Sequence, residues 1–306
     1  MPEPPFRRVQ VIVNPASGRD EPVLNVLNDV FGRYGVDWDI SVTHRYGDAA
    51  ALARRAVDDG VDLVAGYGGD GTQHEIANAL IQSGIGSGRQ TPMGILPGGT
   101  GNGFAREMGV PNTLREATEV LCTSSTTRAV DVGRLRDLGQ AETTDRYFVQ
   151  RLYVGVEPEE QTSRELKDRY GVFAYLVNAA RHARDTSAIH YRTELDGKPF
   201  EFDAERVYVV NSGMMGTGFK ITQTYAIDDG LLDCFMIDQH AHATLAAAAI
   251  RLLDPPVVKA TRYHRQCRTI KIETQPDQAV WTDGEYVGRT PVTVDVIPGA
   301  LAVVVP

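Results

Sequence analysis

The first part of the chain alternates short apolar runs with segments of helical periodicity. The runs that fit β-strands lie at 9–13, 38–43, 63–65 and 93–96. The segments whose apolar residues recur at helical spacing lie at 22–34, 48–59 and 72–81. Repeated strand and helix segments predict an α/β domain with a parallel sheet covered on both faces. Ligands of such sheets gather beyond the carboxyl ends of the strands.

The run at 63–65 leads into a glycine-rich loop, which contains Tyr67 and Asp70 among four glycines. Thr72 and Glu75 have the spacing of a capping box, so we expect the next helix to begin at Thr72. Its free N–H groups would then face the loop and attract phosphate. Because Asp70 would repel phosphate, we expect its carboxylate either to meet a metal ion or to orient the loop. Helix packing is the alternative explanation of the glycines.

After about residue 126 the pattern changes to β-strands. The predicted strands, many joined by Gly, Asp or Pro turns, lie at 129–135, 147–154, 189–195, 207–211, 232–237, 268–273, 280–282, 292–297 and 301–305. Two helices are expected among them, at 171–184 and 241–253. We therefore expect an α/β domain at 1–128 and a mainly β domain at 129–297. A return of residues 298–306 to the first domain is left open.

Composition limits the classes of function. The 306 residues are 42% hydrophobic, enough to form full cores in two domains. The net charge of −9 argues against a nucleic-acid groove, because phosphate backbones require clustered Lys and Arg. Three widely spaced cysteines predict reduced thiols and a cytoplasmic protein. Because the sequence has no transmembrane-length apolar stretch and no signal peptide, we expect any membrane contact to be peripheral.

Three loops that follow predicted strands indicate a nucleotide phosphate site. They lie at 14–19, 68–72 and 98–102 and combine glycines with side-chain donors. The sequence lacks the GxxxxGK[ST] pattern of P-loop proteins, and residues 69–74 match the dinucleotide fingerprint poorly. Zinc-like His and Cys spacing and a G-x-S-x-G serine elbow are also missing from the sequence. Arg19 or Lys220 is a candidate for supplying positive charge to the phosphates.

Ordered motifs run through almost the entire chain. They are Asn14-Pro15-x-x-Gly18, Gly68-Gly69-Asp70-Gly71-Thr72, Pro97-Gly98-Gly99-Thr100-Gly101-Asn102, Asn211-Ser212, Asp228-Asp229-Gly230-Leu231-Leu232-Asp233 and Asp283-Gly284-Glu285. This set resembles the diacylglycerol kinase catalytic domain family, which includes bacterial lipid kinases and sphingosine kinases. The resemblance implies an ATP-dependent lipid kinase with an α/β nucleotide domain, a β-sandwich domain and an active site in the cleft between them.

The resemblance also implies roles for single residues. Those implied to bind ATP are Asn14, Gly18, Thr43, Gly68, Gly69, Asp70, Gly71, Thr72, Gly98, Gly99 and Thr100. Glu285 matches the general base for the acceptor hydroxyl, and Asp283 matches the carboxylate beside it. In an extended segment both side chains face the same side, so their repulsion is expected to raise one pKa. Local sequence alone favours an Asp-Gly hairpin turn with Glu285 exposed.

Magnesium and a lipid acceptor follow from the same resemblance. Asp229, with the backbone carbonyls of Ala226 and Leu231, matches a family Mg²⁺ site, and oxygen ligands suit this ion. A tight Asp-Asp-Gly turn is the alternative explanation of these residues. The implied acceptor is diacylglycerol or a similar lipid, met at the membrane surface during phospholipid biosynthesis. Homodimer formation is left open.

Two departures from the family pattern keep alternatives open. Gly155-Val156-Glu157-Pro158 stands where many members have Gly-Phe-Asp-Ala, and residues 223–226 lack a common proline. One alternative is an NAD kinase-like enzyme, because that related group shares Gly-Gly-Asp-Gly, although an Asn-Asn-Asp ribose motif is missing from the sequence. The other alternative is a nucleotide- or lipid-binding module without catalysis, which the missing aspartate favours.

Overall fold

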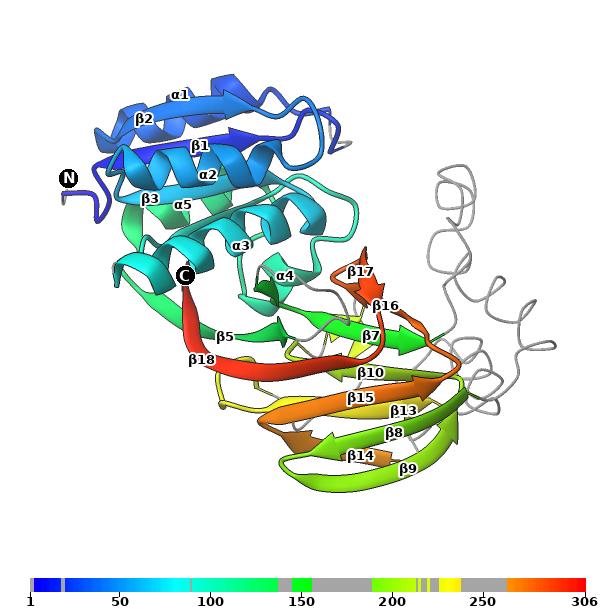
Figure 1. Cartoon of the computed structure of the whole chain (residues 1–306). Coiled ribbons are helices and arrows are strands. Elements are labelled where there is room, and N and C mark those ends of the chain that lie inside the picture. Colours follow the sequence, from blue (N-terminus) through cyan, green and yellow to red (C-terminus); the bar gives the residue numbers. More distant parts are fainter. Residues whose placement is uncertain are drawn as a thin grey trace. The chain divides into compact units, whose positions relative to one another are not determined.

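A computed structural model describes residues 3–17, 20–88, 90–136, 145–155, 189–212, 214–215, 219–220, 226–237 and 263–306 (Figure 1). Backbone contacts divide the chain into two compact units. The first unit consists of Met1–Val132 and Ile297–Pro306, and the second consists of Gly133–Val296. Across the described residues, no helix combines the length and apolar character needed to cross a bilayer.

A parallel sheet forms the centre of the first unit, as the alternating pattern predicts. β1 (Arg8–Val13) lies between β2 (Asp37–Val42) and β3 (Leu63–Gly68), and β4 (Met93–Pro97) pairs with β3. The far end of β18 (Val292–Val304) runs parallel to β4, where Val303 pairs with Met93. Every residue of β3 and β4 is buried, which explains their continuously apolar sequences.

Five helices connect these strands in the described part of the first unit. They are α1 (Val23–Tyr34), α2 (Asp48–Asp58), α3 (Asp70–Ser87), α4 (Gly103–Glu107) and α5 (Leu114–Thr123). α1 packs with α5 and α2 packs with α3. Right-handed crossovers place these pairs on opposite faces, because the chain moves outward from β1 to β2 and then back to β3 and β4.

Two helix ends are fixed by local sequence signals. Gly35 ends α1 in the left-handed region at φ 68° and donates its N–H to the Gly32 carbonyl. Thr113 begins α5 by accepting the Glu116 N–H, and its hydroxyl donates to the Glu116 carboxylate over 2.6 Å. These positions depend on local geometry alone, so the sequence is sufficient to locate them.

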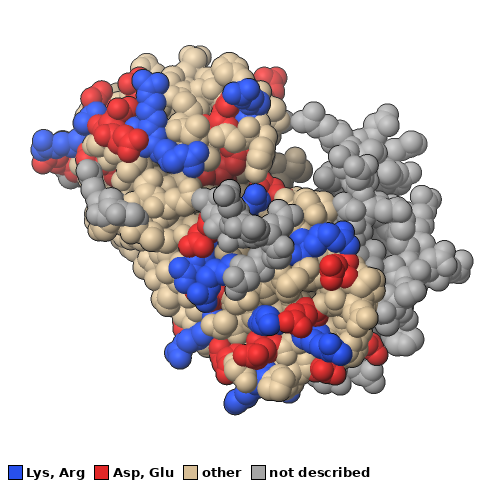
Figure 2. Space-filling view, in the orientation of Figure 1, with Lys and Arg blue, Asp and Glu red and all other residues tan. Residues whose placement is uncertain are grey.

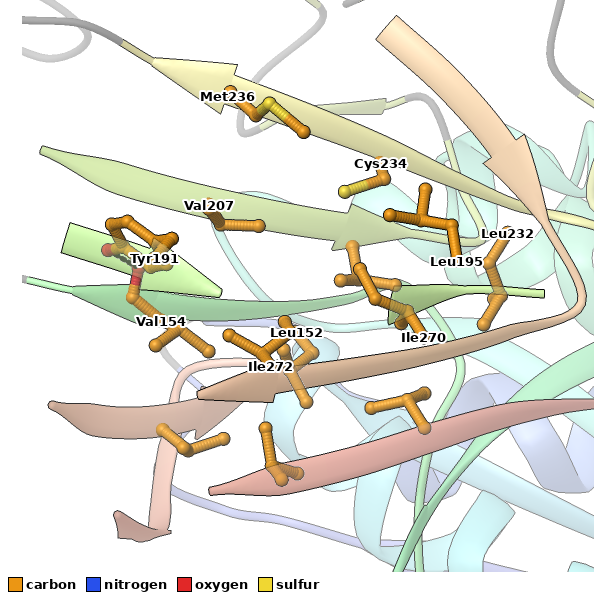
Figure 3. Packing of buried hydrophobic residues seen from close by; sticks show 14 of the residues in the cluster. Leu152, Val154, Tyr191, Leu195, Val207, Leu232, Cys234, Met236, Ile270 and Ile272 are labelled. Atoms are coloured by element: carbon orange, nitrogen blue, oxygen red, sulfur yellow. Dashed lines mark hydrogen bonds between the residues drawn. The ribbon is translucent and has the colours of Figure 1, made fainter. Parts of the chain in front are cut away.

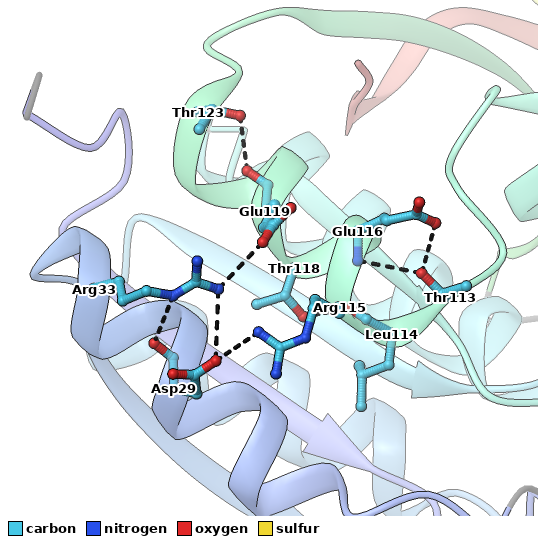
Figure 4. A network of polar contacts seen from close by, with 9 residues as sticks. All are labelled: Asp29, Arg33, Thr113, Leu114, Arg115, Glu116, Thr118, Glu119 and Thr123. Carbon is cyan, nitrogen blue, oxygen red and sulfur yellow. Dashed lines mark hydrogen bonds and ion pairs between the residues drawn. The ribbon is translucent and has the colours of Figure 1, made fainter.

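Exposed charges connect α1 with α5 beside the apolar contact between the two helices (Figure 4). The Asp29 carboxylate accepts from Arg115 at 2.5 Å, and Arg33 donates to Glu119 at 3.2 Å. The hydrogen bond from Arg115 holds the pKa of Asp29 below its usual value. All four side chains are well exposed, so these ion pairs contribute little to stability.

The second unit contains two antiparallel sheets. One has the order β14 (Tyr263–Cys267), β13 (Leu232–Ile237), β10 (Arg206–Val210), β7 (Arg151–Gly155), β16 (Ala279–Thr282) and β17 (Glu285–Arg289). The other joins the near end of β18 to β15 (Thr269–Gln275), β8 (Ile189–Leu195) and β9 (Lys198–Ala204). The remaining strands are β5 (Thr127–Arg136), β6 (Arg146–Phe148), β11 (Met214–Met215) and β12 (Phe219–Lys220).

A single apolar core fills the space between these two sheets (Figure 3). Leu152, Val154 and Cys234 contribute from one sheet, and Tyr191 and Ile272 contribute from the other. Core residues recur at every second position of each strand, which is the alternation that predicts a sheet with one buried face. The second unit is therefore a β-sandwich.

The three cysteines are free and buried, in agreement with the predicted reduced thiols. Burial raises the pKa of Cys122 and Cys267 to about 12. On the face shown in Figure 2, basic and acidic side chains are interspersed over the described residues, without a broad basic patch.

Several strands differ from the sequence prediction. β9, β14 and β17 were not predicted, because charged and polar residues hide their alternation. Residues 147–154 form two strands that a bend at Val149 and Gln150 separates. The runs at 292–297 and 301–305 are one continuous strand, β18. The helices predicted at 171–184 and 241–253 lie outside the described residues.

Candidate functional site

The loops that follow β1, β2, β3 and β4 meet at one edge of the first unit, because these strands are parallel (Figure 1). We call this set of loops, residues 14–17, 43–47, 68–72 and 98–103, the carboxyl-edge site. It contains the residues expected to bind ATP, apart from Gly18, which with Arg19 lies outside the described residues. Thr43, at the end of β2, is only 7% exposed and donates its N–H to the Val13 carbonyl.

Asn14 connects the first loop to the glycine loop. Its N–H donates to the Tyr67 carbonyl at 2.9 Å, and its side-chain amide donates to the Thr72 hydroxyl at 3.0 Å. Its side-chain oxygen accepts the Ala16 N–H, which shapes the turn after β1. Two motifs that lie far apart in the sequence are therefore in direct contact.

The predicted capping box at Thr72 is wrong. α3 begins at Asp70 with Gly69 as its N-cap, and no side chain of the described residues caps it. Thr72 instead accepts the Asn14 amide, and Glu75 accepts the N–H groups of Gly47 at 2.9 Å and Ala49 at 3.2 Å. The distant loops supply N–H donors that would otherwise have no acceptor. Thr72 and Glu75 therefore bond to these donors and not to each other's backbone.

Asp70 orients the loop at 98–102, whereas its own loop at 68–72 is the one that we expected it to orient. Its carboxylate oxygens accept the N–H groups of Gly103 at 3.1 Å and Phe104 at 3.0 Å, in the first turn of α4. This turn follows directly after the loop at 98–102. A carboxylate that accepts two backbone donors fixes both the position and the direction of that turn.

Replacing Asp70 by alanine is therefore expected to lower the free energy of unfolding by about 1–3 kcal/mol, because two amides lose a charged acceptor. Chemical denaturation measures this change, with the exposed Asp39→Ala as the matched control. If Asp70 instead served only as a metal ligand, the variant would keep its stability and require more Mg²⁺ for activity.

Three glycines of the carboxyl-edge site are required by packing. A Cβ atom on Gly99 would lie 2.5 Å from the Cα atom of Gly69, and one on Gly98 would lie 2.9 Å from the Tyr67 ring. A Cβ on Gly68 would lie 2.5 Å from the Thr72 hydroxyl. Such distances are shorter than any stable contact, so the two glycine loops touch backbone to backbone.

Gly71 has no such packing requirement. A Cβ atom there would have open space, with no atom of the described residues within 4 Å, and its φ lies outside the left-handed region. Glycine in a helix is less favourable than alanine, so the fold alone does not explain its presence. Gly71 lies in the first turn of α3, where the N–H groups lack helical acceptors. A helix N-terminus with unhindered N–H groups is a general anion-binding feature.

The second group of predicted site residues lies on a hairpin of the second unit. Asp283 and Gly284 form a two-residue turn between β16 and β17 with φ values of 47° and 96°, and Thr282 pairs with Glu285. This is a type I′ turn, for which Asp-Gly is a preferred sequence. The expected extended geometry, with both carboxylates on one side, is therefore wrong. The hairpin that the local sequence favours is the one that forms, with Glu285 partly buried.

Asp283 holds the bend between β6 and β7. Its carboxylate accepts the N–H groups of Val149 at 2.9 Å, Gln150 at 3.1 Å and Arg151 at 2.7 Å. From another strand end, the Asn211 amide donates to the Val149 carbonyl at 2.9 Å. Asp283 is thus a positioning residue that places the hairpin, with Glu285 at its base, against this bend.

The turn at 226–231 contains the expected magnesium ligands. Asp229 is exposed and accepts the Leu231 N–H at 2.9 Å, and Ile227 anchors the turn because it is fully buried. Gly230 has a φ of 73°, which allows the tight bend. Among the described residues, no three His, Cys, Asp or Glu side chains gather into a metal cluster. The turn offers one carboxylate and backbone carbonyls, a donor set of the oxygen type that Mg²⁺ prefers.

A row of ring side chains crosses the β14–β17 sheet on the face opposite the core. In register, one from each strand, these are His264, Phe235, Tyr208, Tyr153, Trp281 and Tyr286. Tyr153 stacks on Trp281 with centroids 6.0 Å apart, and Phe235 stacks on His264 at 4.6 Å. The buried Trp281 Nε1 lacks a hydrogen-bond partner in the described part of the chain.

Sequence reasoning missed this aromatic row. Its signal lies in the positions that alternate with the core residues, such as Tyr153 between Leu152 and Val154. The row becomes visible only when the strand register is known, since its members are distant in sequence. Of the motif that departs from the family pattern, only Gly155 is described, and the side chain of Lys220 is outside the described part.

Comparisons with known proteins agree with an α/β domain followed by a β-sandwich domain. Residues 8–135 match the model of the diacylglycerol kinase catalytic domain, and residues 151–305 match that of the YegS C-terminal NAD kinase beta sandwich-like domain. A diacylglycerol kinase of Staphylococcus aureus (strain bovine RF122 / ET3-1) is 25% identical over 93% of this chain and 88% of its own length. The diacylglycerol kinase of strain JH9 is 26% identical with the same coverage.

Solved structures show the same fold. A crystal structure of a Bacillus anthracis (strain Sterne) protein has a TM-score of 0.82 and 25% identity and covers 98% of both chains. A further structure from this strain, described as a diacylglycerol kinase, has a TM-score of 0.76 at 24% identity and covers 98% of this chain and 97% of its own. The α/β domain followed by a β-sandwich is thus confirmed.

Proposed function

Because the chain belongs to the diacylglycerol kinase catalytic domain family, we propose that it transfers the γ-phosphate of ATP to a hydroxyl of diacylglycerol or a similar lipid. The observation that carries the proposal is the carboxyl-edge site. There, Asn14, Asp70 and Thr72 link three glycine-containing loops around the N-terminus of α3. Such preorganised N–H groups, with open space at Gly71, suit the phosphates of a nucleotide.

Glu285 is the proposed general base. In the reaction a bond forms between the acceptor oxygen and the γ-phosphorus, the bond from that phosphorus to ADP breaks, and the hydroxyl proton passes to the Glu285 carboxylate. Support comes from its place at the first residue of β17, directly after the turn that Asp283 holds in position. The cleft expected from the resemblance stays a prediction, since it requires both units to meet the same substrates.

The lipid character of the acceptor is supported by the aromatic row. At the β17 end of the row, Tyr286 is exposed and packs edge-on against the partly exposed Trp281, so these two rings provide apolar surface on one sheet face. Apolar pockets with few polar groups are typical of sites for such molecules. The apolar character of this row does not favour a nicotinamide dinucleotide, which carries a charged pyrophosphate.

Mg²⁺ is the proposed metal. Bound between the oxygens of ATP it would neutralise charge that develops during transfer. Asp229 and the carbonyls of Ala226 and Leu231 would hold a second, supporting ion, and the oxygen donors at that turn fit this ion. In this chain the Asp229 turn lies directly before β13, so an ion there would stabilise the start of that strand.

A radiolabelled ATP assay tests the proposal. The full-length protein is incubated with Mg²⁺ and, in separate arms, with diacylglycerol, sphingosine, an isoprenoid alcohol in mixed micelles, or NAD. Phosphorylation of one of the lipids is the expected result. Phosphorylation of NAD alone would overturn the proposal in favour of an NAD kinase-like enzyme, and ATP binding without transfer to any acceptor would favour the non-catalytic module.

The variant Gly71→Ala separates an effect on nucleotide binding from an effect on the stability of the fold. The added methyl group meets open space, so we expect unchanged or slightly higher stability, by up to about 1 kcal/mol from helix propensity. We expect ATP affinity to fall by about tenfold or more, because the methyl group occupies the space proposed for phosphate. Thermal unfolding and equilibrium binding measure the two quantities.

The matched control for this variant is Gly32→Ala. Gly32 lies in α1, also with open space for a Cβ atom and outside the left-handed region, so it offers the same gain in propensity far from the proposed phosphates. Equal ATP affinity in both variants would contradict a nucleotide at the N-terminus of α3.

A further inference from the structure

Tyr46 is unusually exposed for a large aromatic residue. Its side chain, in the loop between β2 and α2, is 73% exposed, the highest value among the exposed large hydrophobic residues of the described chain. The next highest values are 57% for Leu24 and 54% for Ile85. Scattered exposed apolar residues are common on protein surfaces, so exposure alone does not indicate a function. The backbone on either side of Tyr46 and its place on the sheet give the reasons to assign one.

The backbone around Tyr46 is held by two carboxylates. Asp48 accepts the N–H groups of His44 at 2.9 Å and Arg45 at 3.1 Å, and Glu75 accepts the Gly47 N–H at 2.9 Å. The hydrogen bond from the His44 N–H holds the pKa of Asp48 below its usual value, so this acceptor is ionised at neutral pH. Charge-assisted bonds of this kind preorganise the loop. The ring is therefore presented to solvent by a fixed backbone.

The loop also belongs to the carboxyl-edge site. Glu75, which holds Gly47, lies on α3, the helix whose first turn contains Gly71 and Thr72. The strand order is β2-β1-β3-β4, so two strand spacings of about 4.8 Å separate the loop after β2 from the loop after β3. The sum of these two spacings is comparable to the distance between the terminal phosphate and the base of a nucleoside triphosphate.

The direction in which the nucleotide extends across the sheet follows from the contacts that close the loops on each side of α3. Beyond β3, the loop at 98–102 is closed by Asp70, by the contact between Gly69 and Gly99, and by Asn102, whose side chain bonds both backbone groups of Gly99. On the other side β2 is the edge strand of the sheet. Among the described residues, the side toward β2 is therefore the open one for the base of a nucleotide whose phosphates lie at α3.

We infer that Tyr46 is the stacking surface for the base of the nucleotide, an inference that rests on the proposed nucleotide site. Aromatic rings stack on nucleobases with a contribution of about 1–3 kcal/mol per base, and they do so with every base because each has a π-face. Tyr46 therefore contributes affinity without selecting adenine over guanine. ATP and GTP depend on this ring to a similar extent.

Equilibrium binding to the full-length protein tests the inference. The probes are ATP, GTP and inorganic tripolyphosphate, which carries the phosphates without a base, each with Mg²⁺. The variants are Tyr46→Ala, which removes the ring, and Tyr46→Phe, which keeps it. We expect Tyr46→Ala to bind ATP and GTP about tenfold or more weakly and tripolyphosphate as the wild type does. Tyr46→Phe is expected to bind all three within about twofold of the wild type.

Every other result overturns either the stacking role of Tyr46 or the nucleotide site itself. Wild-type affinity of Tyr46→Ala for ATP overturns the stacking role while the proposed kinase stands. An equal loss for ATP and tripolyphosphate in Tyr46→Ala also overturns it, since the ring would then act through the loop backbone. Failure of the wild type to bind ATP and tripolyphosphate overturns the nucleotide site itself, and the stacking role with it.

Discussion

Glutamine in place of Glu285 is expected to lower kcat by about 10²- to 10⁴-fold while ATP affinity stays unchanged. A glutamine amide has nearly the shape of the carboxylate but does not accept the hydroxyl proton, and general-base catalysis contributes an effect of this size. Steady-state kinetics with the best lipid acceptor measures kcat, and equilibrium binding measures ATP affinity. The proposed nucleotide contacts lie in the first unit, so the change should not alter them.

The matched control for Glu285→Gln is Glu194→Gln. Glu194 is an exposed carboxylate on β8 of the same unit, so the chemical change and the loss of charge are identical. The control should keep full activity. Retention of wild-type kcat by Glu285→Gln would assign the proton transfer to another group, whereas a loss of ATP affinity would indicate that Glu285 acts on nucleotide binding.

Alanine in place of Asp283 is expected to lower the free energy of unfolding by about 3 kcal/mol. Three backbone amides, including those of the buried Val149 and Gln150, would lose their charged acceptor. Alanine is also less tolerant than aspartate of the φ of 47° at this turn. Asparagine tolerates that φ and keeps one acceptor oxygen, so Asp283→Asn should lie between the wild type and Asp283→Ala.

Urea denaturation measures this series, and Asp277→Ala is its control, because Asp277 is an exposed aspartate at the other end of β16. A catalytic role for Asp283 without a structural one would give the opposite pattern. The asparagine and alanine variants would then be equally inactive and as stable as the wild type. The proposed positioning role instead requires activity and stability to fall together along the series.

The prediction of the first unit succeeded where local chemistry decides the structure. Apolar runs located β1, β3 and β4, and local signals at Gly35 and Thr113 fix the ends of two helices. Each of these signals depends on neighbours within a few residues. The same reasoning failed for Thr72 and Glu75, since their partners, Asn14 and Gly47, come from loops after other strands.

The site was predicted as a set of residues but not as an arrangement. Asp70 was expected to meet a metal ion or to orient its own loop, and Asp283 was expected to lie beside the base. Both carboxylates instead accept backbone N–H groups of segments far away in the sequence. Spacing of two residues suggested that Asp283 and Glu285 face one side. The positive φ values at Asp283 and Gly284 remove that relation, because period-two alternation holds only in an extended strand.

β18 has a consequence for the order of folding during synthesis. Its residues 292–296 belong to the second unit and its end to the first, where Val303 pairs with Met93. The sheet of the first unit therefore stays one strand short until the whole second unit has left the ribosome. The second unit is one continuous segment and has no such delay. Although most residues of the α/β layer are made first, the layer is completed only after Val303 has been made.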